Sequence, residues 1–238
     1  MKKLAIAFIW NQHQPFYQDT EKKEYIMPWT RLHASKDYYS MAALLERFPF
    51  IRQTFNLTPS LLEQIEDYLS GSRDYYQKTV MPAEQLSPVE QSFLLRHYFD
   101  IHWDKVISSY PRYRQLLELQ GRVREPGEVE QATRRYKPCD YQDLMVWFNL
   151  CWIDPLIRQG NPFLQELERA GQDFSWDDCR QLMEQQLDIL RQVVPVHRRL
   201  QDKGQIEVIT TPFYHPIMPL IIDSHSALRS CPELPLPP

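Results

Sequence analysis

Three short runs along the chain have the apolar content of β-strands. They are Leu4–Trp10, Ile51–Leu57 and Ile206–Thr210. The first and the last are apolar at consecutive rather than alternate positions, a pattern typical of parallel strands that are covered on both faces. In α/β barrels and open α/β sheets the functional groups lie where such strands end. The residues that follow each run are therefore the first place to look for a site.

The rest of the pattern is helical. Apolar residues at helical spacing follow capping residues and stop before glycine or proline, which predicts a series of helices. The expected starts are Ser35, Thr58, Ser87, Pro111, Asp140, Asn161 and Ser175, and the expected ends include Phe48, Gly71, Gly121, Gly171 and Gly204. The helix from Asp140 is apolar nearly all round, so Trp147, Phe148 and Trp152 are expected in the core. We expect a kink at Pro195 and a polar excursion over residues 121–138.

Composition agrees with a helix-rich chain and narrows its partners. The 238 residues are 43% hydrophobic, enough for a substantial core, and six glycines stand against nineteen prolines. The formal net charge is −4, and the basic residues are scattered along the sequence. This balance provides no electrostatic basis for binding nucleic acid or an anionic membrane.

The cysteines and the N-terminus indicate a reducing compartment. Cys139, Cys151, Cys179 and Cys231 form no Cys-x-x-Cys pair, so free buried thiols are favoured over disulfides or zinc. The N-terminal Lys2 and Lys3 with the apolar run behind them imitate a signal peptide, but that run is short and no small-residue cleavage site follows. We therefore expect a cytoplasmic protein.

Two histidines follow the first and third predicted strands. His13 and His215 each stand beside proline and aromatic residues, and Asn56 lies near the end of the second strand. Because the carboxyl ends of parallel strands share one edge, we expect the three side chains to converge there. Imidazole nitrogens both donate and accept hydrogen bonds, so the two histidines would form one shared polar site. A lone histidine is more often a core residue whose ring nitrogens are hydrogen-bonded within the protein. For His33, a role in the site and a structural role are equally favoured.

Aromatic residues gather around the same strand ends. Trp10, Trp29 and Tyr214 are candidates for lining a binding site at these strand ends, because an aromatic ring offers a flat apolar face to a ligand. A position in the core is the equal alternative for each of the three.

Several ordered segments resemble glycoside hydrolase family 57. The segments are His13–Pro15, Arg31–Tyr39, Thr54–Leu62, Asp143–Leu150 and Gly204–Leu220. The resemblance implies an α/β fold: a partial parallel barrel of the family's seven-stranded β/α type, with a large helical insertion at about residues 82–203. It also implies a retaining enzyme of the α-amylase, 4-α-glucanotransferase or amylopullulanase kind, acting on α-glucan or malto-oligosaccharide without a cofactor. The substrate-binding residues expected under it are Trp10, His13, Gln14, Trp29, His33, Asn56, Tyr214 and His215.

The carboxylates of this chain are poor candidates for catalysis. A retaining glycosidase needs two carboxyl groups about 5–5.5 Å apart. Glu207 lies at the entry of the third strand, where a basic structural partner is expected, while Asp223 and Asp37 suit helix termini. The resemblance places the catalytic glutamate and aspartate downstream of Leu220. Residues 1–238 are therefore expected to be the N-terminal part of an enzyme, inactive without its remaining C-terminal part.

Two other classes remain open. One is a metal-dependent polysaccharide deacetylase or α-mannosidase-like barrel, in which His13, His215 and Asp37 would hold a divalent ion. The sequence has no compact metal-binding spacing such as His-x-x-x-His in support of it. The other is a non-catalytic carbohydrate-binding fragment, which keeps the sugar pocket without the carboxyl pair.

Overall fold

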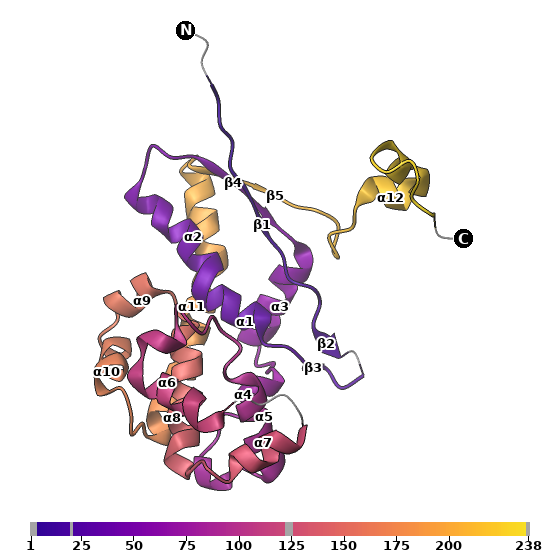
Figure 1. Ribbon diagram of the computed structural model, residues 1–238. Helices are drawn as coiled ribbons and strands as arrows, with labels where there is room; N and C mark the ends of the chain where they lie inside the picture. Colours follow the sequence, from indigo (N-terminus) through magenta and orange to yellow (C-terminus); the bar gives the residue numbers. More distant parts are fainter. Residues whose placement is uncertain (1–3, 20, 122–125, 237–238) are drawn as a thin grey trace.

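The protein is a mixed α/β structure in which helices far outweigh a small parallel sheet (Figure 1). The computed structural model describes residues 4–19, 21–121 and 126–236. Its main sheet has the strand order β1-β4-β5, all parallel, with β1 at Ile9–Gln12, β4 at Gln53–Leu57 and β5 at Ile206–Ile209. A separate antiparallel pair is formed by β2 (Gln18–Asp19) and β3 (Glu24–Tyr25). The three predicted strands are confirmed, with different bounds.

The first strand differs most from its prediction. It was expected over Leu4–Trp10 but covers Ile9–Gln12. Its partner β4 begins at Gln53, and the first bond between the two segments runs from the Thr54 amide to the Phe8 carbonyl at 3.0 Å. Residues 4–7, the described part of the chain before Phe8, pair with no neighbouring strand. Apolar content marked this segment as a strand, but the length of the partner decided where the strand begins.

Twelve α-helices occur in the described residues. They are α1 (Trp29–His33), α2 (Tyr39–Ala43), α3 (Pro59–Leu69), α4 (Tyr75–Lys78), α5 (Pro88–His97), α6 (Pro111–Gln120), α7 (Pro126–Thr133), α8 (Pro138–Cys151), α9 (Pro155–Gly160), α10 (Pro162–Ala170), α11 (Trp176–Asp202) and α12 (Met218–Ile222). Proline stands at the first position of many of them, where its missing N–H has no intrahelical partner to lose. These positions account for part of the high proline content.

The capping residues read at Ser87, Asn161 and Ser175 are confirmed. Thr58 precedes α3 without a side-chain cap, and the helix expected from Asp140 begins at Pro138. Ser87 and Glu90 exchange bonds at the start of α5, with the Ser87 amide donating to Oε2 of Glu90 at 2.7 Å. The side chain of Asn161 caps α10, and Gly171 ends it in the left-handed region at φ 73°. The long helix from Ser175 runs through Pro195 as one α-helix to Asp202.

Two helix predictions are wrong. Ser35 does not begin a helix; it is buried inside a π-helical turn, Ala34–Tyr38, that joins α1 to α2. Its hydroxyl donates to the Arg31 carbonyl at 3.0 Å, so it serves the preceding turn instead of a new one. The polar excursion over residues 121–138 contains α7, which buries Val129 and Ala132. Its first part, residues 122–125, lies outside the described residues.

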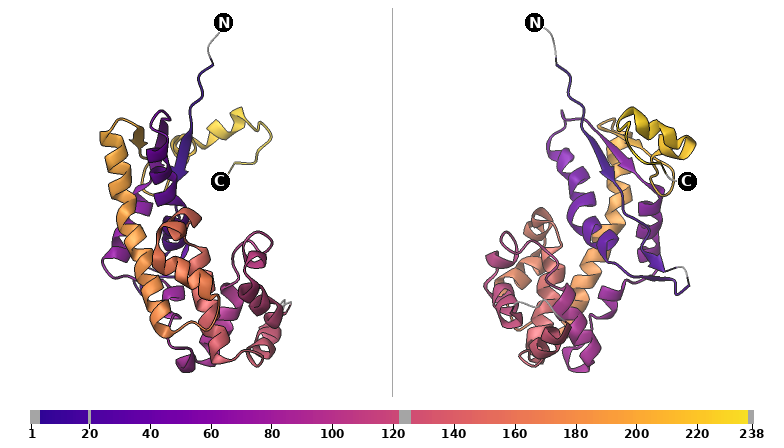
Figure 2. Two further views of the ribbon diagram at one scale, coloured as in Figure 1. Left: turned by 90° about the vertical axis from the view of Figure 1, so that its left-hand side faces the viewer. Right: turned by 45° about the vertical axis from the view of Figure 1, so that its right-hand side comes forward.

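One face of the sheet is covered by helices and the other is not. Figures 1 and 2 show α2 and the C-terminal part of α11 lying along the sheet. Phe55 and Ile206 on the strands pack there against Leu45, Val196 and Leu200. On the opposite face, Ile9 is 60% exposed and Ile209 is 39% exposed. The expectation of strands covered on both faces is therefore wrong, because helices pack on only one side of them.

The larger core lies in the helical body around α8. Every residue from Asp140 to Cys151 in this helix is buried, including Trp147 and Phe148, and Trp152 follows them into the core. The prediction for this helix is confirmed. The described residues form a three-stranded parallel sheet and no closed barrel, and helices fill the chain between β4 and β5. That these helices are an insertion into a barrel stays a prediction.

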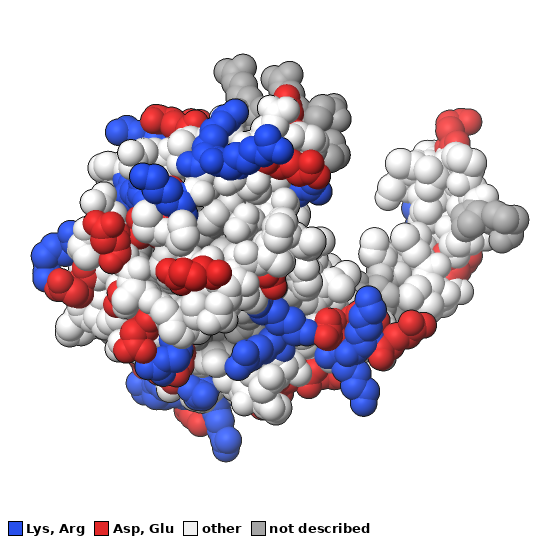
Figure 3. Space-filling model, turned by 90° about the horizontal axis from the view of Figure 1, so that it is seen from below, with Lys and Arg blue, Asp and Glu red and all other residues white. Residues whose placement is uncertain are grey.

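The surface and the cysteines match the composition. Figure 3 shows Lys and Arg interspersed with Asp and Glu over the face it presents. All four cysteines are free, but only Cys151 and Cys179 are buried; Cys139 and Cys231 are exposed, against expectation. Burial raises the pKa of both buried thiols to about 12, so they stay protonated. Of the helices described, none has the length and apolar character needed to cross a bilayer.

Candidate functional site

His13 and His215 meet at the carboxyl edge of the sheet. Their ring centroids lie 4.9 Å apart with an interplanar angle of 66°. His13 directly follows β1, and His215 lies in the segment that leaves β5. More than 200 residues separate them in sequence, and parallel pairing of both strands with β4 brings their ends together. The predicted convergence of the two histidines is confirmed.

The segment after β5 is held in place by two local bonds. The Thr210 hydroxyl donates to the Leu57 carbonyl at the end of β4 at 2.9 Å. The His215 amide donates to the Pro212 carbonyl at 2.8 Å, which closes a tight turn. His215 has a φ of 53°, in the left-handed region that residues other than glycine seldom adopt. Non-glycine residues in this region cluster at functional sites, so the turn is itself a signal for one.

A hydrogen-bonded group behind the first strand fixes His13. Gln14 donates from Nε2 to the Tyr38 hydroxyl at 2.6 Å and accepts from the Tyr17 hydroxyl at 2.9 Å. The Tyr38 hydroxyl in turn donates to the His13 carbonyl at 3.3 Å. Burial raises the pKa of Tyr38 to about 12, so its phenol remains a donor. Gln14, expected to contact substrate, is buried and uses its amide to hold the turn.

The imidazole of His13 is disposed toward its neutral form. Burial lowers the pKa of His13 from its ordinary value, and the neighbouring charge of His215 lowers it further. A neutral imidazole presents one donor and one acceptor. The pair therefore offers both kinds of hydrogen bond to a ligand at neutral pH.

Asn56 joins the edge through a residue that the sequence did not single out. Its Nδ2 donates to Oδ1 of Asn11, the residue opposite it in β1, at 3.0 Å. Next to this pair, Gln12 is 1% exposed, and both its amide atoms lack a hydrogen-bond partner among the described residues. Buried polar groups are normally satisfied. Gln12 is therefore a further candidate for ligand binding. The sequence pattern did not predict it, because within the run Asn11–Gln14 it pointed to His13 and Gln14.

Aromatic residues close in sequence to the two histidines form a cluster of their own. Phe16 lies 5.8 Å from Phe213 and 6.4 Å from Tyr214, measured between ring centroids. Tyr214 is 68% exposed, so its ring is available to a ligand. Of the predicted aromatic subsite residues, Tyr214 is the one that lies beside His215.

The two predicted tryptophans, Trp10 and Trp29, and His33 lie away from the histidine pair. Trp10 stands opposite Phe55, on the helix-facing side of β1, and its Nε1 donates to Gln53 at 2.9 Å. Trp29 is partly buried in the helical body, with its ring 5.8 Å from that of Trp152. His33 packs at 5.3 Å against the same Trp152. Tyr38 connects this second group to the first, since its ring lies 6.2 Å from that of His33 and its hydroxyl donates to the His13 carbonyl.

The three carboxylates considered from sequence are engaged in other contacts. Asp37 pairs with Nδ1 of His33 at 2.6 Å, one helical turn away. Asp223 caps the following 3₁₀ turn by accepting from the His225 amide at 2.9 Å, as expected. The contact of Glu207 in the described chain is the Thr54 hydroxyl at 3.5 Å, in place of the predicted basic partner.

Metal coordination needs several donors at one place. Within residues 4–19, 21–121 and 126–236, no group of three or more His, Cys, Asp or Glu side chains could hold a metal ion. Asp37, one of the three ligands considered for a metal-dependent barrel, is paired with His33.

The fold and the site at the sheet edge together indicate the class of protein. A parallel sheet backed by helices, with polar side chains at the carboxyl ends of its strands, is typical of α/β enzymes. The family model described as glycosyl hydrolase family 57 matches residues 7–230. The chain belongs to that family, and membership supports an enzyme of the glycosidase or transglycosylase type. The comparisons with curated proteins and with solved structures found no match.

Proposed function

We propose that this chain provides the sugar-binding strand ends of a retaining glycoside hydrolase that acts on α-1,4-glucans, by hydrolysis or by transglycosylation. The observation that carries the proposal is the 4.9 Å contact between His13 and His215 at the carboxyl edge of the sheet. Family membership supports the class of reaction. The substrate is an α-glucan or a malto-oligosaccharide, and the enzyme works in the cytoplasm, where free thiols persist.

The two imidazoles bind hydroxyl groups of the sugar at the cleavage point. Hydrogen bonds that tighten as the ring flattens toward an oxocarbenium-like state stabilise the transition state more than the bound substrate. The lowered pKa of His13 keeps it neutral for this role. Tyr214, exposed beside His215, offers an aromatic face for the neighbouring sugar ring.

The nucleophile and the acid/base are proposed to come from outside residues 1–238. Support comes from the three carboxylates considered from sequence, since Asp37, Glu207 and Asp223 contact His33, Thr54 and the His225 amide. A retaining mechanism needs two carboxyl groups about 5–5.5 Å apart on either side of the scissile bond. The 238-residue chain is therefore expected to bind malto-oligosaccharide weakly and to release no reducing sugar.

The test compares histidine variants in binding and in turnover. His13→Ala and His215→Ala in residues 1–238 should lose affinity for maltoheptaose, while His102→Ala, an exposed histidine in the helical body, should bind as before. In a longer chain that includes the carboxyl pair, the same two variants should lower kcat about 10²-fold with a smaller change in KM. Wild-type kinetics in either variant would remove that histidine from the site. If residues 1–238 hydrolyse the substrate, and substitution of Asp37, Glu207 or Asp223 abolishes this activity, the catalytic carboxyl groups do not lie outside this chain.

A metal-dependent deacetylase or α-mannosidase-like barrel is the alternative. The pairing of Asp37 with His33 speaks against it, because Asp37 would have to leave this contact to join His13 and His215. Elemental analysis of purified protein separates the two functions. Stoichiometric zinc, lost in His13→Ala, would favour the metal enzyme over the glycosidase.

A further inference from the structure

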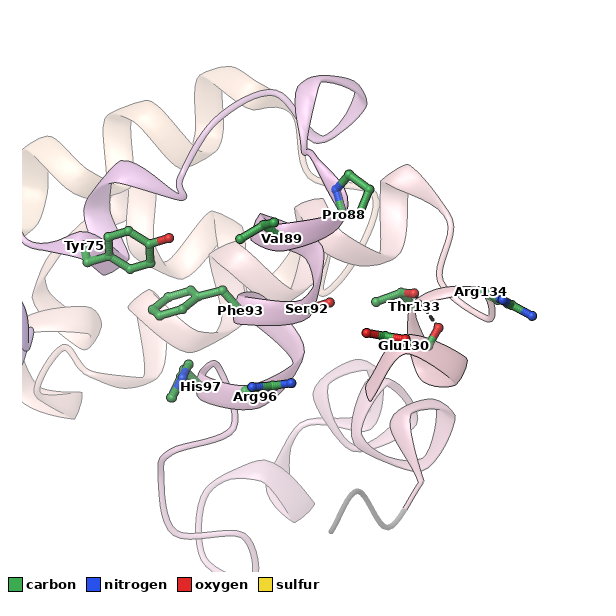
Figure 4. Close-up of a pocket in the computed structure, with 10 residues that line it drawn as sticks. All are labelled: Tyr75, Pro88, Val89, Ser92, Phe93, Arg96, His97, Glu130, Thr133 and Arg134. Carbon is green, nitrogen blue, oxygen red and sulfur yellow. Dashed lines mark hydrogen bonds between the residues drawn. The ribbon is translucent and has the colours of Figure 1, made fainter. Parts of the chain in front are cut away.

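A groove crosses the helical body, away from the strand ends. It encloses about 570 Å³ and lies between α5, α7 and the start of α4 (Figure 4). The lining residues are Tyr75, Pro88, Val89, Ser92, Phe93, Arg96, His97, Glu130, Thr133 and Arg134. None of them belongs to the histidine site, so the groove needs an explanation of its own.

One wall of the groove is aromatic. The rings of Tyr75 and Phe93 meet edge to face at 4.7 Å, and the His97 ring lies 4.5 Å from that of Phe93. Figure 4 shows the three side chains gathered on one side of α5. Tyr75 remains 39% exposed, although its neighbour Tyr76 on the same short helix is buried. An exposed ring that is held by a second ring presents a fixed face to a ligand.

The opposite wall is polar and carries both donors and acceptors. Arg96 comes from α5, Glu130 and Thr133 come from α7, and Arg134 lies in the turn that directly follows α7. Both arginines are exposed, and neither forms an ion pair with any residue in the described part of the chain. Ser92 and Thr133 add hydroxyls between these charges (Figure 4). Guanidinium groups donate hydrogen bonds, a carboxylate accepts them, and hydroxyls do both.

We infer that this groove is a second carbohydrate-binding site, which takes a neutral oligosaccharide. A sugar chain offers an apolar ring face to Tyr75 and hydroxyls that accept from Arg96 and Arg134 and donate to Glu130. The Glu130 carboxylate in the same wall weakens the attraction of the two arginines for an anion. The mixture of an exposed ring with both signs of charge matches a polyhydroxylated ligand better than a phosphate. This assignment stands apart from the function proposed for the histidine edge.

The experiment uses a chain in which the histidine edge is disabled. In the His13→Ala, His215→Ala double variant of residues 1–238, maltoheptaose and cellohexaose are titrated separately into ¹⁵N-labelled protein. The expected result is saturable shift changes at the amides of Ser92, Phe93 and Thr133 with at least one of the two sugars. Because the readout is confined to the groove, it is independent of any result at the strand ends.

Variants in the same background identify the contacts. Tyr75→Ala, and separately Arg96→Ala with Arg134→Ala, should each weaken sugar binding about tenfold. The matched control is Arg114→Ala, an exposed arginine on α6 outside the groove. The side chains of Tyr75, Arg96 and Arg134 are exposed, so their replacement should not disturb the core. Circular dichroism melts of each variant check that the fold is retained. A loss of affinity without a change in melting supports the site.

Three results would overturn the inference. The first is saturable binding of inorganic phosphate at these amides with no response to either sugar, which would make the groove an anion site. The second is the absence of any saturable change with both sugars. The third is sugar binding that Tyr75→Ala and the double arginine variant leave unchanged, which would place the ligand elsewhere. None of the three bears on the proposal for His13 and His215, which is tested by its own variants.

Discussion

At the residue scale, the histidine pair shows how environment adjusts an ordinary side chain. Burial is the main cause of the lowered pKa of His13, and the charge of His215 is the second. A lowered pKa means that the folded state resists protonation. The native arrangement of this edge is therefore favoured above the ordinary histidine value of 6.5 and loses that advantage as the pH falls through the folded pKa of His13.

The first prediction concerns this titration. In His215→Asn, which removes the charge and tolerates the positive φ, the pKa of His13 should rise. It should stay below 6.5, since burial is the larger cause and remains in part. The imidazole Cε1–H signals in NMR spectra recorded across pH measure this directly, and the signal of His197, on α11, serves as the internal control. An unchanged His13 titration in the variant would show that the two rings do not interact.

At the element scale, one buried arginine joins several helices. Arg31 on α1 is fully buried and pairs through Nε with Asp74, the capping residue of α4, at 2.8 Å. Its Nη1 also donates to Asn149 on α8 at 3.2 Å and to Gln186 on α11. Burial works against the charge, but Asp74 outweighs it and raises the pKa of Arg31. The arginine therefore fixes the relative positions of these four elements, which support the π-turn behind His13.

The second prediction follows from this ion pair. Arg31→Met should lower the free energy of unfolding by about 3–5 kcal/mol, because it leaves the Asp74 charge buried without its partner. Adding Asp74→Asn should restore part of the loss, since the uncompensated charge is then gone. Urea unfolding followed by circular dichroism gives both values.

Arg180→Met serves as the control for this pair. Arg180 is an exposed arginine that pairs with Asp177 on the surface of α11, so its urea midpoint should not change. An additive double variant, in which Asp74→Asn adds its own loss to that of Arg31→Met, would contradict the coupling.

At the scale of the whole molecule, the sheet is open. The order β1-β4-β5 leaves β1 and β5 as edges, and the face opposite the helices exposes Ile9 and Ile209. Figure 1 shows the segment that carries α12 extending away from the helical body, and Ile221 and Ile222 are exposed on it. Unpaired strand edges and exposed apolar faces promote association between chains.

The third prediction is therefore self-association of residues 1–238. The sedimentation coefficient should rise with protein concentration, because the open face buries apolar surface against a second copy. Ile9→Lys with Ile209→Lys should reduce this rise, since charges on an edge oppose pairing. Val194→Lys on α11, which also replaces an exposed apolar residue, should leave it unchanged. A chain that stays monomeric at all concentrations would show that the open face is already satisfied.

Much of this architecture was readable from local patterns. The capping box at Ser87, the Asn161 cap and the buried helix from Asp140 depend on residues within a few positions of each other. Such interactions act through the backbone nearby, so the sequence alone predicts them. The placement of His13 and His215 at one edge was also predictable, because all parallel strands end on the same side.

Non-local contacts decided the rest. Apolar content alone determined that a strand lies near the N-terminus, but only pairing with β4 set its start at Ile9. Most of the helices, the family and the histidine edge follow from local spacing and ordered motifs, so they could be predicted from the sequence. Three features follow from packing between distant segments: Gln14 holds a turn, Trp29 faces the helical core, and helices cover one side of the sheet. Each of these depends on which distant side chains come within bonding or packing distance, and no local pattern encodes that distance.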